Sequence, residues 1–131
     1  MLPDTIHFTK MTAGGNDFVC IDNTDGLYGE LLLSPHLPKV IQNLCRRGLC
    51  IGADGVIVAC ERGNGAGVDI VARFLEPDGS EARLCGNGTA CFTYWCLAAG
   101  LVKGPEVDIL TAAGAAHACP NTDDPSRIRV C

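Results

Sequence analysis

Residues 78–91 read DGSEARLCGNGTAC, and this stretch joins a turn, a short strand and the beginning of a helix. Residues 77–80 are the Pro, Asp, Gly and Ser of a tight turn, which folds the preceding strand-like segment back onto residues 81–84. The pattern therefore predicts a hairpin over residues 68–84 that ends at Cys85.

A helix is predicted directly after Cys85. Residues 88–99 are small, aromatic or apolar almost all round, and Gly100 supplies a C-terminal stop. A helix of this composition is buried on most sides. Its first N–H groups have no partners within the helix, and the aligned peptide dipoles place about half a positive charge at that end.

The thiol of Cys85 is the candidate catalytic group. A positive helix end can draw the pKa of a cysteine from about 8.5 toward neutrality, which suits a base that works near pH 7. The same amides could hold the α-carboxylate of an amino acid, and Gly86 and Gly88 permit a close approach of the backbone. The alternative is that Cys85 is an inert buried thiol beside a glycine-rich turn.

The other segments favour a mixture of strands and one more helix. That helix is expected to begin near Pro38 and to end at residues 46–48, with one apolar face that should lie on a sheet. Strands are expected over residues 6–11, 18–21, 56–60, 107–111 and 128–130, with turns or loops at residues 12–16, 61–67 and 121–126.

Composition and charge argue against several classes of protein. The 131 residues are 47% hydrophobic and 19% charged, which is typical of one folded domain. A net charge of −5 argues against a nucleic-acid partner, and no apolar run is long enough to span a membrane. Nine cysteines are an odd number with no secretion signal before them, so reduced thiols in a cytoplasmic protein are expected.

Four motifs resemble those of the diaminopimelate epimerase family, and they occur in that family's order. The central one is the acidic-glycine-serine turn leading to Cys-Gly-Asn-Gly at a helix start. The four are residues 10–11 with 15–18, Arg47 with residues 51–55, residues 78–91, and residues 111–114.

The resemblance implies an α/β (α+β) fold, in which a mostly antiparallel sheet wraps round a central buried helix. Family members are about twice as long as this chain and have two pseudo-symmetric domains. Residues 1–110 would form the N-terminal epimerase-like domain, and residues 111–131 would cross toward a second domain. The chain ends at Cys131 inside a strand-like segment, which favours the same interpretation.

The resemblance also implies an isomerase that converts LL-diaminopimelate to the meso form, a precursor of lysine and peptidoglycan, without pyridoxal phosphate or metal. Two thiols act from opposite faces of the α-carbon. Cys85 would be one of them, and the second would come from the other domain. Asn16 would contact the amino-acid substrate, while the backbone amides of Gly86 and Asn87 would receive its carboxylate. The resemblance also allows a homodimer.

Some positions depart from the family pattern. Glu76 stands where most members have a substrate-contacting asparagine, and its carboxylate would repel a distal carboxylate of the substrate and favour a cationic tail. Alternatively, the Glu76 side chain points away from the substrate or pairs with a basic residue of the second domain. An epimerase or racemase for another amino acid therefore stays open. The remaining departures are Ala90 for arginine, residues 12–13 for histidine-glycine, and Cys50 for glycine.

Three other classes of protein fit the sequence less well than this family. A cysteine-rich metal or redox module would need paired cysteine knuckles, but the cysteines are poorly spaced and the histidines are scattered. No metal ligands are therefore predicted. A proline racemase-like enzyme would carry histidine in place of Asn87. An independent binding domain is disfavoured by the abrupt end at Cys131.

Overall fold

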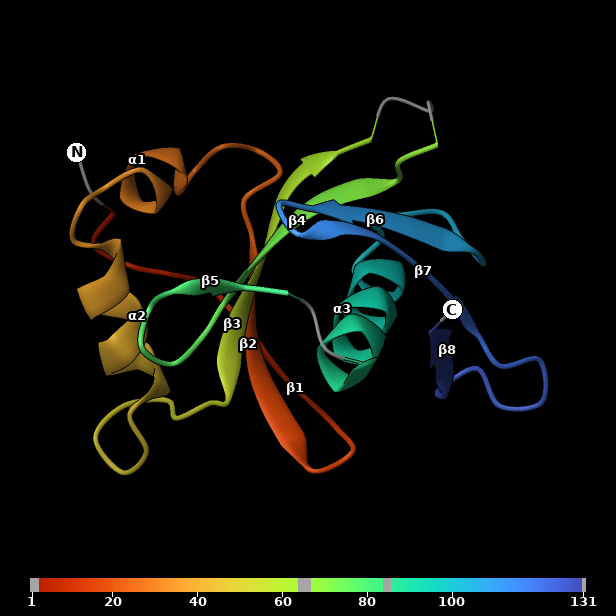
Figure 1. Ribbon diagram of the computed structural model, residues 1–131, viewed down its shortest axis with the longest axis horizontal. Helices are drawn as coiled ribbons and strands as arrows, with labels where there is room; N and C mark the ends of the chain where they lie inside the picture. Colours follow the sequence, from red (N-terminus) through yellow and green to blue (C-terminus); the bar gives the residue numbers. More distant parts are fainter. Residues whose placement is uncertain (1–2, 64–66, 84–85, 131) are drawn as a thin grey trace.

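The computed structural model describes residues 3–63, 67–83 and 86–130 as one curled sheet with three helices (Figure 1). The strands are β1 (Thr9–Ala13), β2 (Asn16–Asp22), β3 (Gly55–Arg62), β4 (Ile70–Leu75), β5 (Glu81–Ala82), β6 (Val107–Thr111), β7 (Gly114–Pro120) and β8 (Ile128–Val130). The helices are α1 (Gly29–Leu32), α2 (Leu37–Cys45) and α3 (Gly86–Ala98).

The sheet is mostly antiparallel. Its order is β1-β2-β3-β4-β6-β7-β8, and β5 pairs with β4 beside this path. Among the pairs that the described residues form, β2 with β3 and β4 with β6 are parallel. Helix α3 contacts β1 and β2 at one end of the order and β7 and β8 at the other. The sheet therefore curls around α3, which confirms the predicted mixed α/β (α+β) fold.

Helix α3 fills the concave side of the sheet. Phe92 and Cys96 are completely buried, and Trp95 is 7% exposed. These side chains pack against Phe18 and Ile57 of the central strands. Burying side chains of this size stabilises the fold by roughly 1.5–3 kcal/mol each. The nearly continuous apolar surface of residues 88–99 is thus explained by burial on most sides.

Helix α2 covers the other face. It begins at Leu37, with Pro38 in its first turn as expected, and buries Leu37, Ile41 and Cys45 against Val19 and Val58. Because both faces of β2 and β3 are covered, these strands are continuous apolar runs without a polar alternation. No helix in the described part of the chain is both long and apolar enough to cross a membrane.

The turn before β5 is held against α2. The Asp78 side chain accepts hydrogen bonds from the Ser80 N–H at 2.9 Å and its hydroxyl at 2.6 Å, and Gln42 Nε2 donates to the Asp78 carbonyl at 2.9 Å. Gly79 has φ +90° and lies directly on Pro38. The predicted hairpin is confirmed over β4 and β5, and its turn has a fixed place on the molecule.

Two elements were not predicted. Strand β7 has the sequence GAAHACP, which lacks the branched and aromatic side chains that favour strands, yet it pairs along its length with β6. The single-turn helix α1 has no side-chain hydrogen bond at its N-terminus, so little in its sequence marks it. Pairing with neighbours, which local sequence does not encode, stabilises β7.

Candidate active site

Two asparagines from distant parts of the chain meet at the start of α3. Asn87, the second residue of that helix, donates a hydrogen bond from Nδ2 to Oδ1 of Asn16 at 2.7 Å. Asn16 begins β2, directly after the turn through Gly14 and Gly15, which have φ of 57° and 89°. Asn87 Nδ2 also faces the carbonyl oxygen of Gly14 at 3.5 Å. Two of the predicted substrate-contacting residues are therefore direct neighbours.

The Asp54 carboxylate holds the side chain of Asn16 in place. Asn16 Nδ2 donates to Oδ2 of Asp54 at 3.1 Å, and the backbone N–H of Asp17 donates to the same oxygen at 3.0 Å. In return the backbone N–H of Asp54 donates to the carbonyl of Asp17 at 2.8 Å. The segment before β3 is thus fastened to the start of β2, and the Asp54 side chain is held in one orientation.

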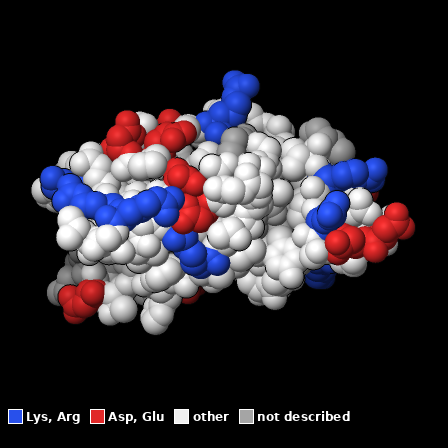
Figure 2. Space-filling model, turned by 90° about the horizontal axis from the view of Figure 1, so that it is seen from below, with Lys and Arg blue, Asp and Glu red and all other residues white. Residues whose placement is uncertain are grey.

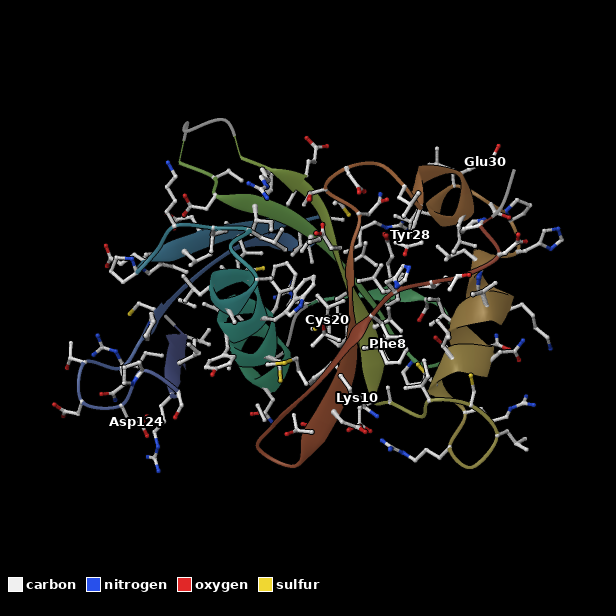
Figure 3. The ribbon with its side chains drawn as sticks, turned by 180° about the vertical axis from the view of Figure 1, so that it is seen from behind. Phe8, Lys10, Cys20, Tyr28, Glu30 and Asp124 are labelled. Atoms are coloured by element: carbon white, nitrogen blue, oxygen red, sulfur yellow. The ribbon has the colours of Figure 1, made fainter. Side chains whose placement is uncertain are left out.

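An ion-pair network lies beside these bonds. Arg47 donates to both carboxylate oxygens of Asp17, at 2.6 and 3.0 Å, and to Oδ1 of Asp54 at 3.2 Å. Lys10 Nζ lies 3.0 Å from Asp17 Oδ2 and also donates to the Gly52 carbonyl. Figure 2 shows basic and acidic side chains in contact at this end, on the side of α2, and Figure 3 shows Lys10 on β1.

The network changes the titration of Asp17. The Arg47 guanidinium, with help from Lys10, holds the pKa of the Asp17 carboxyl well below its usual value, although partial burial opposes the shift. Asp17 is 17% exposed and Arg47 is 59% exposed, so solvent screens the pair only in part. Asp17 is therefore ionised at any physiological pH.

Gly86 lines a hollow next to the helix start. This cavity of about 230 Å³ lies between α3 and the β6–β7 hairpin. A second cavity of about 350 Å³ adjoins it and is lined also by β4 and β5. Arg83, Thr111 and Ala113 line both cavities. Residues 111–114, the last of the four sequence motifs, therefore lie at this hollow. A helix N-terminus favours negative charge, and Arg83 lines both cavities, so the region suits an anion.

Cys85 lies outside the described residues; in the sequence it directly precedes Gly86, where α3 begins. Several of the described thiols are poor bases. Burial raises the pKa of Cys20 to about 12, and desolvation also raises the pKa of Cys45, Cys60 and Cys96. Figure 3 shows Cys20 in the interior of the molecule. These four stay protonated near neutral pH.

Glu76 lies in the turn that joins β4 and β5. Its backbone N–H donates to the Ser80 carbonyl and its own carbonyl accepts from the Gly79 N–H, both at 2.8 Å. The residue is half-buried, and within the described ranges its carboxylate forms none of the hydrogen bonds or ion pairs found. The structure thus does not join Glu76 to the Asn16–Asn87 pair.

Sequence reasoning assigned no role to Asp54, Arg47 or Arg83. Asp54 and Arg47 belong to one of the motifs, and their charge was the only signal that could have singled them out. Arg83 stands two residues before Cys85, but which side of the chain it faces depends on the hairpin. The residues that the structure describes contain no group of three His, Cys, Asp or Glu side chains that could hold a metal ion.

Comparison with known sequences identifies the relatives of this chain. Residues 8–130 match the profile of the family described as "Diaminopimelate epimerase". The diaminopimelate epimerase of Methanothermobacter thermautotrophicus is 38% identical over 109 residues, and that of Caldanaerobacter subterraneus is 39% identical over 110 residues. Each alignment covers 83% of this chain and 36% of the relative. The chain thus spans about a third of the length of these curated relatives.

Solved structures share the fold at low sequence identity. A hydroxyproline epimerase from Agrobacterium vitis, with bound trans-4-hydroxy-L-proline, matches with a TM-score of 0.68 at 17% identity, over 94% of this chain and 40% of that one. A methylitaconate-delta-isomerase matches with a TM-score of 0.65 at 20% identity, over 93% of this chain and 36% of that one. At these identities the likeness concerns the fold alone.

Proposed function

This chain belongs to the diaminopimelate epimerase family, and from that membership we propose that it forms one half of an epimerase active site. The complete enzyme, which joins this chain to a second domain, converts LL-diaminopimelate to the meso form. It works in the cytoplasm and needs neither pyridoxal phosphate nor metal. Residues 1–110 are the N-terminal domain in this proposal, and residues 111–131 lead toward the second.

The meeting of Asn16 and Asn87 at the start of α3 carries the proposal. Two polar side chains with free hydrogen-bonding capacity lie beside a helix N-terminus, next to the position of Cys85 in the sequence. An amino acid has a carboxylate for the helix amides and an ammonium group for a carbonyl oxygen. The arrangement therefore suits the binding of an α-amino acid more than that of an uncharged ligand.

The chemistry is a proton transfer on each face of the α-carbon. The Cys85 thiolate takes the α-proton and becomes a thiol, and the electron pair left on the carbon spreads into the carboxylate. The helix N–H groups at Gly86 and Asn87 stabilise the growing negative charge. A thiol of the second domain then gives its proton to the opposite face and becomes a thiolate. Proton and charge balance, and the carbon is inverted.

The 131-residue chain alone should not epimerise its substrate, because it supplies an acid or base on one face only. Turnover by the purified chain, with contaminating enzyme excluded, would contradict the two-domain mechanism. A homodimer of the complete enzyme is compatible with this scheme and is measured by light scattering.

The decisive experiment replaces Cys85 in the complete enzyme. Cys85→Ala should abolish epimerisation while the circular dichroism spectrum and the melting temperature stay near those of the wild type. Incubation of each epimer in D₂O should show which α-proton exchange depends on Cys85. Cys20→Ala and Cys60→Ala are the matched controls. If a folded control variant lost activity equally, Cys85 would not be the special thiol.

A racemase or epimerase for another amino acid is the second candidate, favoured by Glu76. Its carboxylate belongs to the turn beside β5 and carries none of the bonds described above. A negative charge there would disfavour the distal carboxylate of diaminopimelate. Substrate preference therefore depends on where this side chain points in the complete enzyme.

A further inference from the structure

Asp54, Asn16 and Asn87 form a relay of side-chain hydrogen bonds. Asp54 Oδ2 accepts from Asn16 Nδ2 at 3.1 Å, and Asn16 Oδ1 accepts from Asn87 Nδ2 at 2.7 Å. The three residues come from the segment before β3, the start of β2 and the first turn of α3. The relay therefore connects a carboxylate outside the helix to a side chain at its N-terminus.

The carboxylate decides the direction of every bond in the relay. An ionised carboxylate only accepts hydrogen bonds, whereas an amide can present either its oxygen or its NH₂ group. Asn16 must therefore turn its NH₂ toward Asp54, because the reverse orientation would put oxygen against oxygen. Its own oxygen then faces Asn87, which must in turn present its NH₂.

The Asp54 side chain is itself fixed by two partners. Arg47 Nη2 donates to Oδ1 at 3.2 Å, and the backbone N–H of Asp17 donates to Oδ2 at 3.0 Å. Oδ2 therefore faces the start of β2, where it accepts from both the Asp17 N–H and Asn16 Nδ2. The ion pair between Arg47 and Asp54 therefore sets the orientation of the relay.

The relay leaves a defined set of groups for a ligand. One N–H of Asn87 is used by Asn16 and the other faces the Gly14 carbonyl, so its Oδ1 remains as an acceptor. Within the described residues, none of the hydrogen bonds found is donated to that oxygen. Asn16 keeps one N–H of its NH₂ group, because only the other is donated to Asp54.

We propose that Asp54 is a positioning residue that fixes the amide orientations of Asn16 and Asn87, so that the pair offers one carbonyl oxygen and one N–H to the substrate. This inference rests on the proposed function for the identity of that substrate. The carbonyl oxygen suits an ammonium group and the N–H suits a carboxylate, as in a zwitterionic amino acid. The reversed relay would present the opposite pair of groups.

NMR of the isotopically labelled 131-residue chain tests the orientation directly. Scalar coupling across the hydrogen bond should join Asn87 Nδ2 to the side-chain carbonyl carbon of Asn16. The opposite orientation would instead couple Asn16 Nδ2 to the side-chain carbonyl carbon of Asn87. Observation of that second pattern in the wild-type chain would overturn the inference, without any variant.

Three variants test the role of Asp54. Asp54→Ala removes the acceptor, so the Asn87–Asn16 coupling should vanish and the Asn87 side-chain amide should exchange with solvent about tenfold faster. Asp54→Asn should restore both, because its oxygen can still accept from Asn16 and from the Asp17 N–H. Asp17→Asn is the matched control, since it removes a carboxylate that binds the same Arg47 and leaves the relay intact. Unchanged coupling in folded Asp54→Ala, or equal loss in Asp17→Asn, would overturn the inference.

In the complete enzyme, Asp54→Ala should lower kcat/KM about ten- to a hundredfold, and Asp54→Asn should recover most of that loss. A wild-type enzyme that epimerises no amino acid would contradict the proposed function alone. A folded Asp54→Ala enzyme with wild-type kcat/KM would contradict the role of Asp54 alone.

Discussion

Gly14 packs closely against the side chain of Asn87. A Cβ atom placed on Gly14 would stand 2.5 Å from Asn87 Oδ1 and 2.7 Å from Nδ2, far inside contact distance. The glycine also has φ +57°, a conformation that other residues adopt at a cost. The turn between β1 and β2 therefore has a part in placing the side chain at the helix start.

Gly14→Ala should push Asn87 out of its bond with Asn16. The neighbouring Gly15→Ala is a close control, because Gly15 has φ +89° and a Cβ there would meet nothing within 4 Å. We expect Gly14→Ala to lower kcat/KM of the complete enzyme about tenfold or more relative to Gly15→Ala. Side-chain amide shifts of Asn87 should move only in the first variant. Equal effects of both variants would mean that turn strain alone is responsible.

Gly79→Ala should destabilise the fold by about 3 kcal/mol. The residue has φ +90°, and a Cβ there would lie 2.3 Å from the Cα of Pro38, so both strain and overlap with α2 oppose it. Gly26→Ala, at φ +80° with open space around it, should cost only about 1 kcal/mol. Urea unfolding measures both free energies. Similar values for the two would show that the turn does not depend on its contact with α2.

The Asp17 carboxylate should make stability depend on acid pH. Its pKa is lowered in the folded chain, mainly by Arg47, so its contribution is complete above the unfolded pKa of about 4 and is lost as the pH falls through the folded value. Asp17→Asn should reduce the free energy of unfolding by about 1 kcal/mol at pH 7 and by less at pH 2. Asp123→Asn, in the exposed loop before β8, removes the same charge away from the network. A loss with Asp17→Asn that did not shrink in acid would refute the linkage.

Alkylation rates should separate the cysteines. The buried thiols Cys20 and Cys96 have raised pKa values and no exposed surface, so iodoacetamide should not modify them until the chain unfolds. Cys50 is exposed and gives the rate of an accessible thiol. If Cys85 is the activated thiolate, it should react faster than Cys50 below pH 8, as measured by mass spectrometry of peptides. A Cys85 rate no higher than that of Cys50 would argue against an activated thiol.

Glu76→Asn should shift preference toward diaminopimelate if the carboxylate points into the site of the complete enzyme. At an effective dielectric constant of about 20, two like charges about 6 Å apart cost roughly 2 to 3 kcal/mol, or one to two orders of magnitude in selectivity. The measurement compares kcat/KM for LL-diaminopimelate and for basic amino acids in both forms. An unchanged ratio would mean that Glu76 faces away.

Much of the local structure could be predicted from the sequence. The turn before β5, the hairpin with β4 and the start of α3 depend on the conformational preferences of Pro, Asp and Gly within a few residues of one another. The nearly continuous apolar surface of α3 likewise indicated burial on most sides. Each of these features depends on residues within its own short segment of the chain.

Only the tertiary structure decided how the site is assembled. Strand β7 has little preference of its own and is held by its neighbours β6 and β8. Asn16 lies 38 positions from Asp54 and 71 from Asn87 along the chain, and their bonds exist because β2 pairs with β3 and packs on α3. Hydrogen bonds over such separations depend on the closing of the whole sheet around its helix, which no local pattern specifies.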